Sequence, residues 1–200
     1  MALVEANISV SLDGYITGPG VEQTPGLGEG GEALHAWIDD ERGRRLLDDE
    51  FAAWGAVITS RRVYEDTGGW GEDGHLLPAH PSRGGAVEVG TMPIFVVTHR
   101  PHEPVVKSAA TFTFVTDGIA AAVTPAAEAA GDKLVNIMGG ASIIRQAFDA
   151  GLVDRLRLHL APVLLGSGTR LFRRGVPARL QLIAHQHTPH ATHLTYQVVR

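Results

Sequence analysis

A glycine pair between an apolar strand and a helix constrains the fold of this chain most. Residues 134–138 form an apolar run of strand type, and Gly139 and Gly140 follow it directly. The apolar residues Ile143, Ile144, Ala147 and Phe148 then recur at the spacing of a helix, which ends before Gly151. Such a turn directs free backbone N–H groups and the positive end of a helix dipole at one spot, which suits a phosphate. On the glycines alone, an ordinary strand-to-helix turn explains the pattern equally well.

The composition predicts one globular domain over residues 1–200. The chain has 44% apolar and 20% charged residues and lacks an 18-residue apolar span, so no membrane association is expected. It has no cysteine and no basic, signal-like N-terminus, from which we expect a cytoplasmic protein. The net charge is −5 and the basic residues are scattered, so we expect no nucleic-acid partner.

Strand-like and helix-like segments alternate along the chain, which predicts an α/β domain with a largely parallel sheet. Strands are expected at residues 3–10, 56–59, 93–98, 111–115, 134–138 and 153–165, and helices at 34–53, 61–66, 119–130 and 141–150. The runs 180–186 and 193–199 predict an antiparallel pair. The glycine-rich stretches 18–31 and 68–90 are expected to be loops, and the second is long enough to cover a pocket.

The expected helix at residues 34–53 has one apolar and one charged side. The charged stretch 39–42 is interpreted as solvated. We expect the buried side to consist of Trp37, Ile38, Leu46, Leu47 and Phe51.

Four motifs follow one another along most of the chain. They are SLDGYI at 11–16, TSRRVYE at 59–65, VVTHRP at 96–101 and the long block at 138–172. In this order and spacing the chain resembles the dihydrofolate-reductase-like superfamily, in the branch of the C-terminal reductase domain of the bifunctional riboflavin-biosynthesis deaminase/reductase. The resemblance implies a mixed, mostly parallel sheet with helices on both faces and a C-terminal antiparallel hairpin. It also implies NADPH across the strand ends, a homodimer, and often a cis bond within the glycine pair.

The resemblance implies that one set of residues binds NADPH: Thr59, Ser60, Arg61, Arg62, Thr98, His99, Arg100, Gly139, Gly140, Ala141, Ser142 and Ile143. Within it, the residues from Gly139 to Ser142 correspond to the pyrophosphate contacts, and Thr98 and Arg100 to the loop around the 2′-phosphate. Arginines that converge on one dianion select NADPH over NADH.

Two positions in this set have alternative interpretations. Ser60 stands where relatives usually carry glycine, and a serine there can also cap the following helix. Arg61 and Arg62 either bind the adenosine phosphates or simply lie at an exposed helix start, where the helix dipole disfavours cations.

The substrate side is predicted from fewer residues. Asp13, just past the first strand, is the first candidate for orienting a substrate, and a turn-forming Asp-Gly is the alternative. Tyr15, which the resemblance makes the second catalytic candidate, stands where riboflavin reductases carry a lysine that contacts the substrate. Further substrate-binding candidates are Ser11, Trp37, Tyr64 and Trp70, whose aromatic members are core residues in the alternative interpretation. Asp48, Asp49 and Glu50 all lie where dihydrofolate reductases place a catalytic carboxylate, and the sequence does not select one.

Four histidines cluster near the C-terminus, at His185, His187, His190 and His193. We interpret them as a surface hairpin in preference to a metal site, because no carboxylate or cysteine lies nearby in the sequence.

Two classes of function remain. The chain is either an NADPH-dependent oxidoreductase acting on a small heterocyclic or ribose-linked substrate, or a non-catalytic nucleotide-binding or regulatory module that retains the fold.

Overall fold

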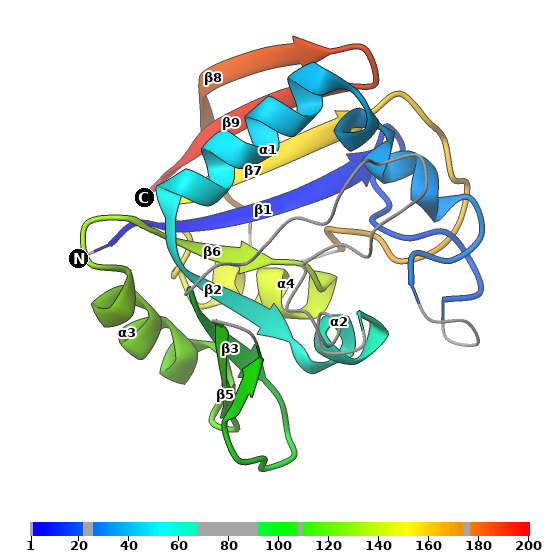
Figure 1. Cartoon of the computed structure of the whole chain (residues 1–200). Coiled ribbons are helices and arrows are strands. Elements are labelled where there is room, and N and C mark those ends of the chain that lie inside the picture. The colour runs from blue at the N-terminus through cyan, green and yellow to red at the C-terminus, as the bar shows by residue number, and fades with distance from the viewer. Residues whose placement is uncertain (1, 22–25, 68–91, 108–109, 174–176) are drawn as a thin grey trace.

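A single mixed sheet organises the molecule (Figure 1). The computed structural model describes residues 2–21, 26–67, 92–107, 110–173 and 177–200. Within these residues, nine strands lie in the order β4-β5-β3-β2-β6-β1-β7-β9-β8. Their bounds are β1 Val4–Ser11, β2 Trp54–Ser60, β3 Pro93–Val97, β4 Val105–Lys107, β5 Ala110–Val115, β6 Leu134–Met138, β7 Arg155–Ala161, β8 Arg179–Thr188 and β9 Ala191–Val199.

The centre of the sheet is parallel and its two margins are antiparallel. The neighbours β5, β3, β2, β6, β1 and β7 pair in parallel, whereas β4, β9 and β8 pair antiparallel. The mixed, mostly parallel sheet and the C-terminal hairpin are therefore confirmed. The short edge strand β4 was not predicted, because three residues are too few to show an alternating pattern. Since parallel strands end at the same edge, the last residues of β1, β2, β3, β6 and β7 meet there.

Helices cover both faces of the sheet, as expected (Figure 1). They are α1 Glu41–Ala53, α2 Arg61–Asp66, α3 Gly118–Ala130 and α4 Ala141–Asp149, with a 3₁₀ helix, η1, at Gly31–Asp39. Helices α3 and α4 pack on one face against the apolar side chains of β1, β2 and β6. On the other face, η1 and α1 cover β1, β7 and β9. None of the helices in these described ranges has both the length and the apolar character needed to cross a membrane.

The single helix expected at residues 34–53 is interrupted at Asp40. Asp40 has extended backbone angles, and its Oδ1 accepts hydrogen bonds from the backbone N–H groups of Arg42 at 2.8 Å and Gly43 at 3.1 Å. It is therefore the N-cap of α1, and η1 precedes it as a separate element. A Cβ at Gly43 would lie 1.6 Å from the Trp37 carbonyl oxygen, so the two helical segments meet too closely for any larger residue.

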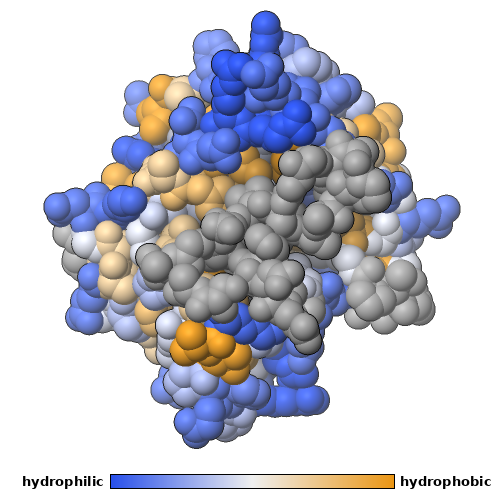
Figure 2. All heavy atoms as spheres, in the orientation of Figure 1, coloured by the Kyte–Doolittle hydropathy of each residue, from blue (hydrophilic) through white to orange (hydrophobic). Residues whose placement is uncertain are grey.

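The expected division of this segment into two sides is confirmed. Trp37, Ile38, Leu46 and Leu47 are buried in one cluster with Ala191, and Phe51 packs against them. Glu41, Arg45 and Asp48 on the outer side of α1 are exposed. The surface over this part of the molecule is mostly hydrophilic (Figure 2). The stretch 39–42 is not only a solvated surface, however, because Asp40 starts the helix.

Replacement of Asp40 by alanine is expected to lower the free energy of unfolding by about 1 kcal/mol, because two N–H groups of α1 lose their acceptor. Asp40→Asn keeps an acceptor oxygen and should retain most of this stability. Urea denaturation of both variants tests the prediction, with Asp48→Ala as a control on the exposed side of α1. Equal losses for Asp40→Asn and Asp40→Ala would contradict the capping role.

Candidate functional site

The glycine turn lies at the carboxyl edge of the sheet, between β6 and α4. Gly139 and Gly140 have φ angles of +73° and +80°, which side chains other than glycine rarely adopt. A Cβ on Gly140 would lie 2.8 Å from Ser60 Oγ, so the turn packs closely on the start of α2. The bond between the two glycines is trans, contrary to the family tendency. Among the described residues no side chain caps α4, so its first N–H groups are open to a ligand from this part of the structure.

Hydroxyl groups at the end of β2 connect the neighbouring elements. Thr59 Oγ1 donates to the Met138 carbonyl at 2.9 Å, immediately before the glycine pair. Ser60 Oγ accepts from Val63 N at 3.2 Å and thus caps α2, as the sequence suggested. The remaining predicted residues of α4 divide between core and surface: Ala141 and Ile143 are buried, whereas Ser142 is exposed.

The predicted cationic residues have different surroundings. Arg61 and Arg62 form i,i+4 ion pairs with Glu65 and Asp66, and Arg62 also donates to the Val21 carbonyl. The third, Arg100, lies in the loop after β3, where its backbone N–H donates to Thr98 Oγ1 at 3.1 Å.

The loop that carries Arg100 presents its side chains to solvent. His99 and Arg100 are both exposed, and within the described ranges no carboxylate pairs with the Arg100 guanidinium. The glycine turn, the start of α2 and this loop follow three neighbouring parallel strands, β6, β2 and β3. Open N–H groups and an unpaired guanidinium are the donors that a phosphate requires.

Asp13 anchors a loop at the end of β1. Its Oδ2 accepts from Gly166 N at 2.7 Å, and its Oδ1 accepts from Leu165 N at 3.1 Å and from Ser11 Oγ at 2.6 Å. These hydrogen bonds, that of Ser11 above all, lower the pKa of Asp13. The turn alternative thus gains direct geometric support, while the substrate role of Asp13 and Ser11 stays a prediction.

Tyr15 belongs to the same turn. Its backbone N–H donates to Ser11 Oγ at 2.9 Å, and the Arg170 guanidinium lies 4.5 Å from the centre of its ring. A cation–π contact therefore holds the buried ring against the loop that Asp13 anchors.

The aromatic residues proposed as pocket walls lie elsewhere. Trp37 is 2% exposed, its ring stacks on His159 with centroids 4.3 Å apart, and its Nε1 donates to Ser9 Oγ. Tyr64 packs against Phe112 and Phe114 in an aromatic cluster under α2. Trp37 therefore has the core position that the sequence left as the alternative, and Tyr64 is half-buried at the margin of the core; a substrate contact of either residue stays a prediction. Trp70 lies outside the described residues.

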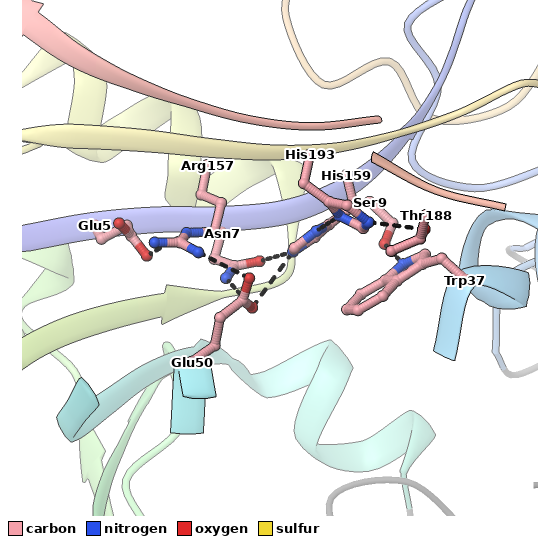
Figure 3. A network of polar contacts seen from close by, with 9 residues as sticks. All are labelled: Glu5, Asn7, Ser9, Trp37, Glu50, Arg157, His159, Thr188 and His193. Atoms are coloured by element: carbon pink, nitrogen blue, oxygen red, sulfur yellow. Dashed lines mark hydrogen bonds and ion pairs between the residues drawn. The ribbon is translucent and has the colours of Figure 1, made fainter. Parts of the chain in front are cut away.

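A buried polar network lies between α1 and the sheet (Figure 3). The Arg157 guanidinium contacts Glu5 Oε1 at 3.1 Å and Glu50 Oε1 at 3.0 Å, and Asn7 Nδ2 donates to Glu50 Oε2 at 2.9 Å. Burial raises the pKa of Glu5. Burial acts the same way on Glu50, but His159, Arg157 and Asn7 outweigh it and lower the pKa of that carboxyl.

The network distinguishes the three carboxylates of α1. Asp48 and Asp49 are exposed, whereas Glu50 is 3% exposed and points at β1 and β7 (Figure 3). Glu50 is therefore the one that faces the sheet.

The network continues to His159, which the sequence did not point to, and to His193, which was assigned to a surface hairpin. His159 Nε2 lies 2.8 Å from Asn7 Oδ1, and His159 Nδ1 lies 2.7 Å from His193 Nδ1. A signal was present in the sequence, since polar residues alternate with apolar ones along two strands. They are Glu5, Asn7, Ser9 and Ser11 on β1, and Arg155, Arg157 and His159 on β7. Such alternation normally indicates a solvated face, but here η1 and α1 cover it.

The surface-hairpin interpretation is right for three of the four C-terminal histidines. His185, His187 and His190 are exposed, but His193 is buried beneath Trp37. Within the described part of the chain, no group of three metal-ligating side chains lies close enough together to bind a metal ion.

A mostly parallel mixed sheet, closed by a C-terminal hairpin and bearing a glycine turn at its carboxyl edge, defines a domain of dihydrofolate-reductase-like fold. Residues 2–194 match the family described as RibD C-terminal domain. The chain therefore belongs to the RibD C-terminal domain family. No curated protein matches the sequence.

Solved structures share the fold at low identity. A protein from Shewanella sp. PV-4, assigned provisionally to riboflavin biosynthesis, is 18% identical, with a TM-score of 0.70 and full coverage of both chains. A pyrimidine reductase-like protein from Corynebacterium diphtheriae is 17% identical, with a TM-score of 0.63, over 100% of this chain and 92% of that one. RibD from Acinetobacter baumannii is 16% identical, with a TM-score of 0.66, over 100% of this chain and 59% of that one.

Truncation of Glu50 is expected to destabilise the protein by about 3 kcal/mol, because Glu50→Ala removes the buried carboxylate that pairs with the Arg157 guanidinium and accepts from Asn7 Nδ2. The neighbouring Asp49→Ala, on the exposed side of α1, should change the free energy of unfolding by less than about 0.5 kcal/mol. Urea denaturation compares the two. Similar small effects for both variants would show that the network does not hold α1 on the sheet.

Proposed function

We propose that this chain is an NADPH-dependent reductase of the riboflavin-pathway type, acting on a small heterocyclic or ribose-linked substrate. The observation that carries the proposal is the glycine turn at Gly139 and Gly140, at the carboxyl edge of a parallel sheet and at the uncapped start of α4. Membership of the RibD C-terminal domain family supports the same reaction class.

The donors along this edge fit the phosphates of a dinucleotide. The backbone N–H groups at the start of α4 face the pyrophosphate position, with Gly140 in contact with Ser60. Arg100, exposed and without a carboxylate partner in the described ranges, supplies the cation for a 2′-phosphate. Arg61 and Arg62 reach the adenosine phosphates only by exchanging their i,i+4 carboxylate partners for the ligand.

NADPH, when bound, supplies the hydride for the reduction. The chain's own contribution is to position the cofactor and hold the substrate beside it, since an acceptor must lie within about 3 to 3.5 Å of the donor atom. Asp13 and its neighbours shape the end of β1 next to the turn, where they fix the loop around Gly166. We assign them this positioning role together with the proposed substrate contact.

Arg100→Ala is expected to weaken NADPH binding by at least about tenfold, because one charge-assisted hydrogen bond contributes about 1.5 to 3 kcal/mol. NADH binding should change much less, since NADH lacks the 2′-phosphate. Titration with both nucleotides, followed by nicotinamide fluorescence, tests this, with Arg45→Ala on the outer side of α1 as the control.

Equal losses for both nucleotides would remove the 2′-phosphate role of Arg100. Failure of the unmodified protein to bind either one would overturn the reductase proposal. Binding without oxidation of NADPH by dihydrofolate or by pyrimidine precursors of riboflavin would favour the non-catalytic module instead.

We also propose that the protein is a homodimer that pairs through β8. This strand forms one edge of the sheet, and Leu180, Leu182 and Ile183 on it are 41%, 48% and 46% exposed. Two copies of an exposed edge can pair antiparallel about a two-fold axis, which satisfies both rows of backbone groups.

Leu182→Lys is expected to convert the dimer to a monomer, because it places a charge on the apolar edge that the two copies would bury against one another. Val106→Lys on β4, which lies at the opposite edge and is 70% exposed, is the matched control and should leave the dimer intact. Sedimentation velocity distinguishes the states. A monomeric unmodified protein, or dissociation caused by Val106→Lys alone, would contradict pairing through β8.

A further inference from the structure

Two buried histidines face one another across neighbouring strands, and we call His159 and His193 the histidine pair. They are cross-strand partners on β7 and β9, and both are less than 5% exposed. Their Nδ1 atoms lie 2.7 Å apart, which requires one proton between them. The remaining nitrogens lie against Asn7 Oδ1, at 2.8 Å from His159 Nε2, and Thr188 Oγ1, at 3.0 Å from His193 Nε2.

The hydrogen bonds around the neutral pair have one consistent direction. Asn7 donates its amide N–H to Glu50, so its oxygen accepts and His159 Nε2 must carry a proton. Neutral His159 then accepts at Nδ1 from the Nδ1–H of His193. His193 Nε2 is left as an acceptor for the Thr188 hydroxyl. Every ring nitrogen therefore has a partner.

One additional proton reverses the direction of two hydrogen bonds, the one between the rings and the one to Thr188, without breaking either. With both nitrogens protonated, His159 donates through Nδ1 to His193 Nδ1. His193 then carries its proton on Nε2 and donates to Thr188 Oγ1. The Thr188 hydroxyl turns to the Ala191 carbonyl, 3.4 Å away in the β8–β9 turn. The singly protonated pair is thus also fully hydrogen-bonded.

With a second additional proton, no arrangement keeps all of these hydrogen bonds. Both Nδ1 atoms would then carry hydrogens directed at one another across 2.7 Å, and the bond between the rings would be lost. We propose that the histidine pair is a pH-sensitive switch, which takes up one proton with all its hydrogen bonds intact and admits a second only when the two rings separate.

A carboxylate and an aromatic ring lie against His159. Glu50 Oε2 lies 3.5 Å from His159 Nε2, and the Trp37 ring stacks on the His159 ring with centroids 4.3 Å apart. The charged groups that act on His193 are Glu50 on α1, Asp40 at the N-cap of α1 and Arg157 on β7, whereas β8 contributes the uncharged Thr188.

Burial and the neighbouring His159 lower the pKa of His193 from 6.5 to about 4. An unfolded chain therefore binds a proton between these two pH values that the folded chain excludes. The free energy of unfolding rises with pH wherever the unfolded state binds more protons than the folded state. This contribution to stability is therefore lost as the pH falls from 6.5 to about 4. Acid thus lowers the free energy of unfolding, and the charge that it places on His193 lies against the Trp37 ring.

Urea unfolding at intervals from pH 4 to pH 7 tests the switch. The slope of the unfolding free energy against pH reports the difference in bound protons. Glutamine does not titrate, so in His193→Gln the slope should be smaller by the equivalent of up to one proton. His185→Gln, on exposed β8, should have the slope of the unmodified protein. An unchanged slope for His193→Gln would overturn the proposal.

Nitrogen NMR of the histidine rings in the unmodified protein supplies a second readout that needs no core variant. The neutral pair should show the proton on Nδ1 of His193 and on Nε2 of His159. As the pH falls the pair should take up one proton, with a second only near pH 4 and together with loss of the Trp37 contact. Two independent protonations at ordinary histidine pH values, with the contact retained, would contradict the switch.

Discussion

The placement of α1 depends on Arg157, because this side chain is the shared partner of two buried carboxylates. Glu5 and Glu50 are 0% and 3% exposed, and the guanidinium between them offsets part of the cost of burying their carboxylates. Glu5 comes from β1, Glu50 from α1 and Arg157 from β7, so the interaction forms only when all three elements are docked. A network of this kind fixes one arrangement of the helix on the sheet, because any shift of α1 leaves a charge unpaired in the interior.

The sequence predicts those parts of the fold that follow from periodicity and glycine. The apolar run before Gly139 identified β6, and the helical spacing after it identified α4. Both bounds of α2 were also predicted, since Ser60 caps it. The interruption at Asp40 was missed because the apolar spacing continues across it. The side-chain cap and the close approach of Gly43 to Trp37 depend on tertiary geometry.

The buried polar network was missed for a different reason. Alternating polar residues on β1 and β7 carry the same pattern as a solvated sheet face, and only the position of η1 and α1 shows that this face is covered. His193 was grouped with His185 and His187 by spacing alone. The pairing of β7 with β9 instead turns His193 toward His159. Patterns along one strand specify which side chains share a face, but the chain segment that covers this face is specified by long-range contacts.

The carboxyl edge of the sheet and the buried network under α1 differ in how their polar groups are hydrogen-bonded. The first leaves donors for a ligand, whereas the second pairs its groups internally and stabilises the fold. At the carboxyl edge, Ser11, Asp13, Thr59 and Thr98 hydrogen-bond to nearby backbone or to one another, which fixes the turns. The N–H groups at the start of α4 and the guanidinium of Arg100 stay available to a ligand. Under α1, by contrast, charges and rings pair with one another across β1, β7 and β9. The hydrogen bonds that shape the carboxyl edge do not involve the histidine pair, so we expect the proposed separation of its rings to change the attachment of η1 and to leave the glycine turn in place.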